Sequence, residues 1–207
     1  AIPIIVVMSF LIGIVLAYQA QGQLSRLGAG AFTIDLVAIS ILREMGVLLT
    51  AIMVAGRSGS AFAAALGSMK LNEETDAMQV MGLSVNGTLI LPRILGLVIA
   101  VPILTAVSNL AGIGGAWAVG VLLLDISTLE FATRLVDAVD MDTVMVGISK
   151  APVFAVLIGA VSCLRGLQVT ASAEELGQLT TRAVVESIFL VIIADAVFSI
   201  IYTELGI

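Results

Sequence analysis

Five apolar runs, each long enough to cross a lipid bilayer, are the feature that most constrains this chain. They cover residues 2–18, 36–66, 94–124, 144–164 and 187–203. A spanning helix needs ~20 mostly apolar residues or slightly fewer. Only 12% of the 207 residues are charged, far below the level of soluble domains. We therefore predict an all-α polytopic membrane protein, a single transmembrane domain over residues 1–207 with about five spanning helices.

The third run, residues 94–124, contains no charge and is longer than one span needs. As a continuous helix it would measure ~46 Å, against ~30 Å for the hydrocarbon core. It is too short for two spans joined by a turn, so that alternative is the weaker one. We predict one span with a bend or an extension beyond the membrane, marked by Asn109, Gly112, Gly114 and Gly115.

The composition argues against catalytic chemistry. The chain has no histidine and a single cysteine, Cys163. We therefore predict no catalytic residue, no metal site and no disulfide. A net charge of −6 argues against binding to nucleic acid. The first run opens at Ala1 with no basic region before it, so we expect that the chain begins inside a longer polypeptide.

Basic residues predict the orientation in the membrane. Five flank the loops after the second and fourth runs, and two flank the opposite loops; in chain order the first group is Arg57, Lys70, Arg93, Arg165 and Arg182, and the second is Arg26 and Arg134. Loops rich in lysine and arginine stay in the cytoplasm. We predict cytoplasmic loops at 67–93 and about 165–183, and an outer loop at about 125–143.

Residues 72–82, NEETDAMQVMG, form an acidic and amphipathic stretch in the first of these cytoplasmic loops. Asn72 is a possible N-cap, carboxylates favour the first helical turn, and Gly82 ends the pattern. We predict a short helix at about 70–84. A membrane-surface helix would carry basic residues, so a groove on a partner protein is the better fit. The partner-binding candidates are Lys70, Glu73, Glu74, Asp76, Met78 and Met81.

Several segments together resemble one family. They are AGRSGSAFAAALGSMKLNEETDAMQVMGL at 55–83, LPRIL at 91–95, LREMG at 42–46, TTRAVVES at 180–187, and Asp195. The chain resembles the MlaE permease family, the membrane subunit of bacterial ABC transporters that move phospholipids and related lipids across the envelope. Two departures stand out: Ala65 takes the place of a glutamate that the family usually has, and the interfacial helix before the first span is absent.

The resemblance implies a homodimeric permease in the bacterial inner membrane, with the stretch at 70–84 as the coupling helix on a separate ATPase subunit. This chain has no phosphate-binding loop of its own, so ATP and Mg²⁺ would be bound by that partner and no cofactor by this chain. A periplasmic lipid-binding subunit of the MCE type is a further expected partner. ATP binding would reshape a lipid cavity between the two copies and expel the lipid.

Charges inside the runs are the candidates for substrate binding, because an unpaired charge in the bilayer is costly. They are Arg43, Glu44, Lys150 and Asp195. Arg43 and Glu44 point about 100° apart on a helix, so we do not expect them to pair with each other. An internal ion pair of Arg43 or Lys150 with Asp195 is the structural alternative. The resemblance implies that Arg43 and Glu44 border the lipid cavity, with an apolar wall from Leu16, Leu24 and Leu27.

Small residues recur at every fourth position of the second run. One row holds Ala51, Ala55, Gly59, Ala63 and Gly67, and a second holds Gly56, Ser60, Ala64 and Ser68. This spacing lets helices approach closely in lipid, so we favour packing over ligand binding, above all for Ala55, Gly59, Ala63 and Gly67.

Two other functions remain open on the sequence alone. An ion- or proton-coupled secondary transporter would use Glu44, Lys150 and Asp195 as a relay, but the halves of the chain show no internal repeat. A membrane scaffold that transports nothing is the other.

Overall fold

The computed structural model describes residues 1–123, 126–170 and 172–206, apart from the side chain of Ala31. Five helices in this part of the chain are long and apolar enough to span a membrane: Ile2–Arg26, Thr33–Leu71, Asn86–Leu123, Met141–Leu167 and Ala173–Glu204. The predicted all-helical fold with five spans is therefore confirmed. The end of the third run at Leu124 and the start of the outer loop at Asp125 lie outside the described residues.

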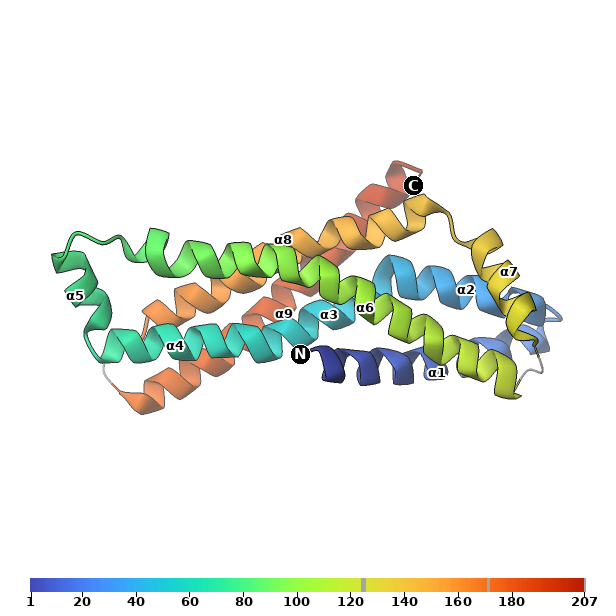
Figure 1. Ribbon diagram of the computed structural model, residues 1–207, viewed down its shortest axis with the longest axis horizontal. Coiled ribbons are helices and arrows are strands. Elements are labelled where there is room, and N and C mark those ends of the chain that lie inside the picture. The colour runs from blue at the N-terminus through green and yellow to red at the C-terminus, as the bar shows by residue number, and fades with distance from the viewer. Residues whose placement is uncertain (124–125, 171, 207) are drawn as a thin grey trace. The chain divides into compact units, whose positions relative to one another are not determined.

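Three of the spans are uninterrupted α-helices along their length: α1 (Ile2–Arg26), α8 (Met141–Leu167) and α9 (Ala173–Glu204). The second combines α2 (Thr33–Ser40), α3 (Gly46–Val54) and α4 (Ser60–Leu71) with π-helical turns at Ile41–Met45 and Ala55–Gly59. A short 3-10 turn, Gly30–Phe32, precedes it. Figure 1 shows the path of the chain.

The third span is one helix, so the two-span alternative is wrong. A π-helical turn at Asn86–Ile90 leads into α6 (Leu91–Leu123), which passes through Pro102 and the four predicted bend residues. The glycines among them serve contacts with α1: a Cβ on Gly115 would meet the Phe10 carbonyl, and a Cβ on Gly13 would meet the Gly112 carbonyl. Small residues here let two backbones touch.

Two shorter helices lie in the connections. α5 (Glu74–Val80) falls within the predicted coupling segment. α7 (Thr128–Ala138) lies within the predicted outer loop, for which no helix was predicted. The signal was present: the Ser127 hydroxyl accepts a hydrogen bond from the Glu130 amide at 3.1 Å, as in the S-x-x-E capping pattern.

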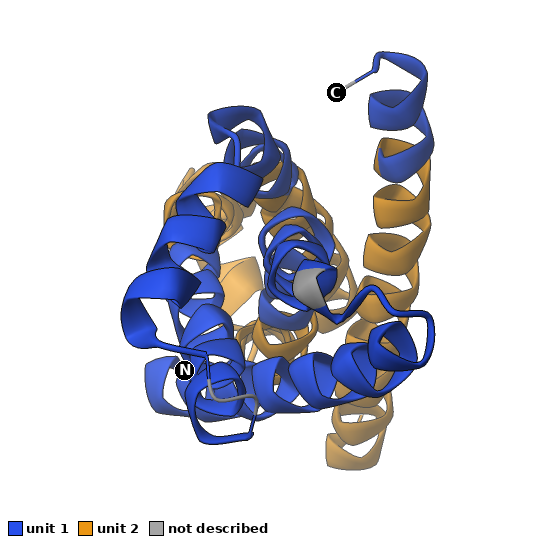
Figure 2. Cartoon of the chain, turned by 90° about the vertical axis from the view of Figure 1, so that its right-hand side faces the viewer, with its two compact units in different colours: residues 1–50, 102–150, 199–207 blue, residues 51–101, 151–198 orange. Residues whose placement is uncertain are grey.

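The described chain divides into two compact units, coloured separately in Figure 2. The first holds residues 1–50, 102–150 and 199–207, and the second holds 51–101 and 151–198. In the first, Phe131 of α7 packs into an apolar cluster with Ala17, Ile34, Ala116 and Val119. α7 is thus anchored by Phe131, and Leu135 of the same helix also packs against this cluster.

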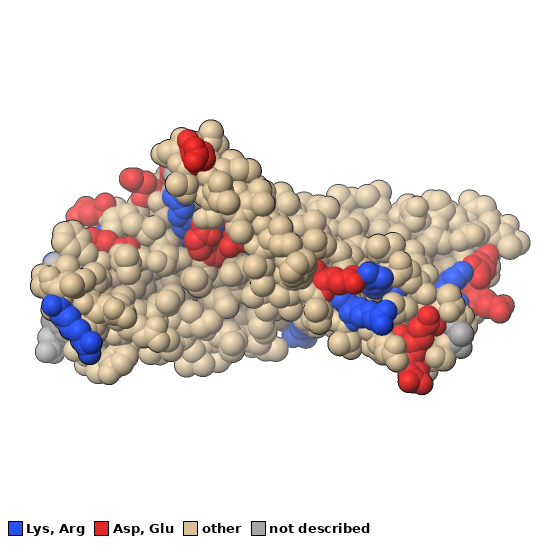
Figure 3. Space-filling model, turned by 180° about the vertical axis from the view of Figure 1, so that it is seen from behind, with Lys and Arg blue, Asp and Glu red and all other residues tan. Residues whose placement is uncertain are grey.

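In the second unit, glycines again mark the helix contacts. A Cβ on Gly59 would lie 2.7 Å from the Ser162 Oγ, and a Cβ on Gly166 would lie 2.7 Å from the Ala63 carbonyl oxygen. Outside such contacts, many large apolar side chains on the spans are exposed. On the face drawn in Figure 3, charges gather in a few clusters and leave broad uncharged areas, as lipid-facing surfaces require.

Candidate functional site

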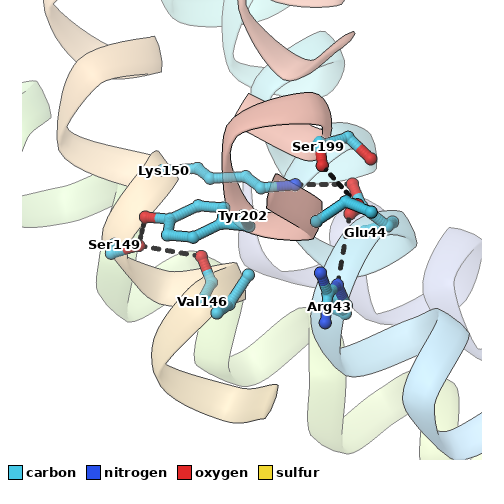
Figure 4. A network of polar contacts seen from close by, with 8 residues as sticks. Arg43, Glu44, Val146, Ser149, Lys150, Ser199 and Tyr202 are labelled. Atoms are coloured by element: carbon cyan, nitrogen blue, oxygen red, sulfur yellow. Dashed lines mark hydrogen bonds and ion pairs between the residues drawn. The ribbon is translucent and has the colours of Figure 1, made fainter. Parts of the chain in front are cut away.

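Arg43, Glu44 and Lys150 lie together in the first compact unit (Figure 4). Arg43 and Glu44 belong to the π-helical turn Ile41–Met45, and Lys150 belongs to α8. The Lys150 Nζ donates a hydrogen bond to the Glu44 Oε2 at 2.6 Å. π-Turns inside α-helices occur frequently at functional sites.

The Arg43 Nε lies 3.8 Å from the Glu44 Oε1. These neighbours were not expected to form a good pair, and the structure brings them only to this distance. The separation is too long for a hydrogen bond but within the range of an ion pair. The Glu44 side chain is flexible enough to place one oxygen near each cation, which an estimate from helix angles alone leaves out.

Burial makes the Lys150–Glu44 pair energetically demanding. The Lys150 side chain is fully buried, whereas those of Glu44 and Arg43 are 25% exposed. Removing an ammonium group from water costs several kcal/mol unless a counter-charge is close. Glu44 supplies that charge and still presents part of its carboxylate, beside Arg43, to the surface of this unit.

A chain of hydroxyl groups adjoins this pair. The Ser149 Oγ donates to the Val146 carbonyl at 2.9 Å, so its proton is committed, and the Tyr202 hydroxyl at 2.6 Å must donate to Ser149. The sequence analysis missed Ser149 and Tyr202. Two features of the sequence could have indicated these residues. Ser149 directly precedes a lysine inside a span, and tyrosine is favoured near the ends of spans.

Asp195 lies half-buried in α9, in the part of that helix that belongs to the second unit. The structure brings Arg43, Glu44 and Lys150 together in the first unit. The role of Asp195 in substrate binding stays a prediction.

A groove of about 300 Å³ lies between α1 and α2 in the first unit. Its lining includes Leu16, Gln19, Gln23, Leu24, Leu36 and Ser40. Two of the three predicted wall leucines are thus part of it, while Leu27 follows the end of α1 and is 79% exposed. The sequence analysis missed the two glutamines. Ser40 lies about one turn before Glu44, so the groove and the charges share one helix.

The coupling segment turns sharply at Glu73. Its φ of 60° is left-handed, which lets α4 end at Leu71 and α5 start at Glu74. Asn72 closes α4 and does not cap α5, because the left-handed residue separates the two helices. Such strained residues cluster at functional sites.

The surface of this segment is acidic and apolar. Lys70 donates a hydrogen bond to Asp76 at 2.7 Å, and Glu73 and Glu74 are exposed. Val80 is 90% exposed and Met81 68%, while Met78 is half-buried. The apolar face available to a partner therefore includes Val80, which the sequence analysis did not single out.

The two small-residue rows differ in burial. Ala55, Gly59, Ala63 and Gly67 are buried within the second unit. From the other row, Gly56 and Ser68 are exposed, and a Cβ on Gly56 would meet nothing within 4 Å. In the predicted packing row, Gly59 lies against Ser162 of α8 and Gly67 against Leu176 of α9.

Comparisons with known proteins agree on one family. The family model described as "Permease MlaE" matches residues 1–201. A probable ABC transporter permease protein of Rickettsia bellii is 32% identical over 94% of this chain and 75% of its own length. Another from Synechocystis sp. is 31% identical over 89% of this chain and 70% of its own length.

A relative from Arabidopsis thaliana is named "Protein TRIGALACTOSYLDIACYLGLYCEROL 1, chloroplastic". It is 34% identical over 92% of this chain, which covers 55% of that longer protein.

Proposed function

Because this chain belongs to the MlaE permease family and is the membrane subunit of an ABC transporter, we propose that it moves a phospholipid or a related lipid. The lipid would travel between the inner membrane and the outer envelope of a bacterium. The energy would come from ATP hydrolysis in a separate ATPase subunit, which an ABC permease requires as a partner.

One observation carries the proposal: Glu44, a member of a buried ion pair, lies on the same spanning helix as one wall of a largely apolar groove. Lys150 and Glu44 hold a fixed charge among membrane-spanning helices, with Arg43 beside them. Ser40 of the groove lies about one turn from Glu44 along the second span, and Leu16 and Leu24 supply apolar wall of that groove from α1. A lipid offers the matching pair of features, a polar head group and hydrocarbon chains.

The Arabidopsis relative supports the substrate class, because its name includes the word for a galactosylated diacylglycerol, which is a lipid. Charges near the groove would meet the phosphate or hydroxyl groups of a head group, and the exposed part of Glu44 and Arg43 would be the first contact. Gln19 and Gln23 would add hydrogen bonds at the opposite wall.

The proposed mechanism couples this site to the ATPase through α5. Two permease copies would enclose the lipid, and two ATPase subunits, which hold ATP and Mg²⁺, would bind the acidic and apolar surface of α5. A periplasmic MCE-type subunit would receive or deliver the lipid. ATP binding would favour the conformation with lower lipid affinity, so the lipid leaves.

Lipid retention and transfer test this function. Arg43→Ala and Glu44→Ala should each reduce phospholipid co-purified with the complex about tenfold, because a charge-assisted hydrogen bond to the head group is lost. ATP-driven transfer between vesicles should fall with it. Glu130→Ala and Arg134→Ala remove an exposed ion pair on α7 and serve as matched controls.

The outcomes separate the alternatives. Wild-type lipid content and transfer in both variants would make the charges structural. Transfer driven by a proton gradient without ATP would favour an ion-coupled transporter, and assembly without any transfer would favour a scaffold.

A further inference from the structure

A second groove in the first compact unit has a different character from the one beside α1. It has a volume of about 450 Å³ and lies between α6, α7, α8 and the side chain of Leu42. Nine of its ten lining residues are apolar, among them Ala106, Leu110, Val136 and Ile148. The tenth is Asn109.

Asn109 is 97% buried, since its residual exposure is 3%. Its side-chain oxygen has no hydrogen-bond partner among the residues that the structure describes. The oxygen occupies the space that a side chain on Gly46 would fill. The nearby Gly46 carbonyl already accepts hydrogen bonds from Thr50 and Ser108, at 2.8 and 3.2 Å, and offers no donor.

An unsatisfied amide among membrane-spanning helices is costly, and a partner for it would be favourable. A half-turn about the Cβ–Cγ bond exchanges the oxygen and the NH₂ group, so Asn109 can offer the groove either an acceptor or a donor. An apolar pocket of 300–1,000 Å³ with a few placed polar groups is typical of sites for small ligands.

This groove is separate from the charged site. α8 meets Leu42 through Gly147, where a Cβ would collide with the Leu42 carbonyl oxygen. Ile148 lines the groove, whereas Lys150, two positions later, points about 200° away and binds Glu44.

We infer that this groove binds one hydrocarbon chain of a membrane amphiphile, whose hydroxyl or ester group forms a hydrogen bond with Asn109. A spanning helix from a partner fits poorly. Along α6 the lining extends only from Ala106 to Ile113, ~10 Å, against ~30 Å for a span. The inference goes beyond the proposed lipid transport, because it needs neither the ATPase nor the Lys150–Glu44 pair.

Photolabelling of the purified permease tests it. The probe is a sixteen-carbon alcohol with a diazirine in its chain, and the labelled peptides are mapped by mass spectrometry. We expect saturable labelling of peptides that contain Leu110, Val136 or Ile148. Ala106→Phe, which fills the groove, should abolish it, and Ile103→Phe, on an exposed part of α6, should leave it unchanged.

Asn109→Leu should weaken binding of the alcohol about fivefold, the loss of one hydrogen bond, and should not weaken binding of the matching alkane. Val136→Trp blocks the exposed rim from α7 and replaces Ala106→Phe if that variant does not fold. Labelling spread evenly over lipid-facing peptides, or equal in the Ala106, Val136 and Ile103 variants, would overturn the inference. Because no ATPase is present, failure of lipid transport leaves this result unaffected.

Discussion

Lys150 is the residue whose environment departs most from its ordinary preference. It is fully buried, its ammonium group lies 2.6 Å from the Glu44 carboxylate, and the two residues are 106 positions apart in the chain. A pair of this kind contributes little net stability when intact, because desolvation offsets the attraction. Loss of Glu44 alone, however, takes a close counter-charge away from the buried Lys150 ammonium group.

Glu44→Gln should therefore destabilise the permease by about 3 kcal/mol, and the double variant Glu44→Gln with Lys150→Met should recover most of that loss. Thermal unfolding in detergent measures both. Arg134→Gln, which breaks an exposed i,i+4 pair on α7, is the control and should change stability by less than about 0.5 kcal/mol. Equal stability of the single and double variants would mean that Lys150 does not depend on Glu44.

The sequence identified these charges because intramembrane charges are rare and costly. It did not identify which cation Glu44 binds, since the partner is 106 residues away and no local pattern encodes that separation. Ser149 and Tyr202 were not predicted for the same reason, because their hydroxyl groups form a hydrogen bond only when these parts of α8 and α9 lie side by side.

At the scale of elements, the contact of the π-helical turn Ala55–Gly59 with α8 in the second unit depends on a residue without a side chain. A Cβ on Gly59 would lie 2.7 Å from the Ser162 Oγ and 3.4 Å from the Ile158 Cγ2, both in α8. At Gly56, one turn earlier on another face, a Cβ would meet nothing within 4 Å. The two glycines thus form a matched pair.

Gly59→Leu should lower stability by about 1–3 kcal/mol, because the larger side chain forces the two helices apart. Gly56→Leu should change it by less than about 0.5 kcal/mol. Thermal unfolding in detergent compares them. A stable Gly59 variant would show that α8 can shift at this contact without loss.

The surface of α5 carries the next prediction. Reversing Glu73, Glu74 and Asp76 to lysine should weaken ATPase docking while the permease remains folded, since the exposed Lys70–Asp76 pair contributes at most about 1 kcal/mol. Co-purification of the ATPase measures docking. The control replaces Asp137 and Asp140 with lysine, since both are exposed and lie in or just after α7. An undiminished ATPase yield in the triple variant would exclude a role of these charges.

Helical elements were predictable from the length and composition of the runs, because the bilayer leaves few alternatives to a helix. The π-helical turns and α7 were not predicted. A hydropathy average does not distinguish a π-helical turn from an α-helical one. α7 is too polar on one face to be predicted as a membrane span. The N-cap at Asn72 failed because Glu73 adopts a left-handed conformation that only the tertiary context imposes.

At the scale of the whole molecule, five spans predict that the connection at 72–85 and the one that precedes α9 lie on one side of the membrane and α7 on the other. This arrangement can be tested because Cys163 is the only cysteine and is buried. In a Cys163→Ala background, Ser84→Cys and Glu174→Cys should react with an impermeant maleimide only after the cytoplasmic side is opened. Asp137→Cys should react in intact cells. Reaction of Ser84→Cys and Asp137→Cys from the same side would contradict five spans.

The π-helical turns in the span Thr33–Leu71 have a consequence for how such permeases can diverge. Each turn accommodates about one residue more than an α-helical turn, so the register of the helix beyond it differs from that of a regular α-helix. Deleting one residue there would restore a regular helix and rotate everything beyond it by about 100°. In a relative shortened by one residue at this turn, the row of small residues would then face a different helix, even if the rest of the sequence were identical.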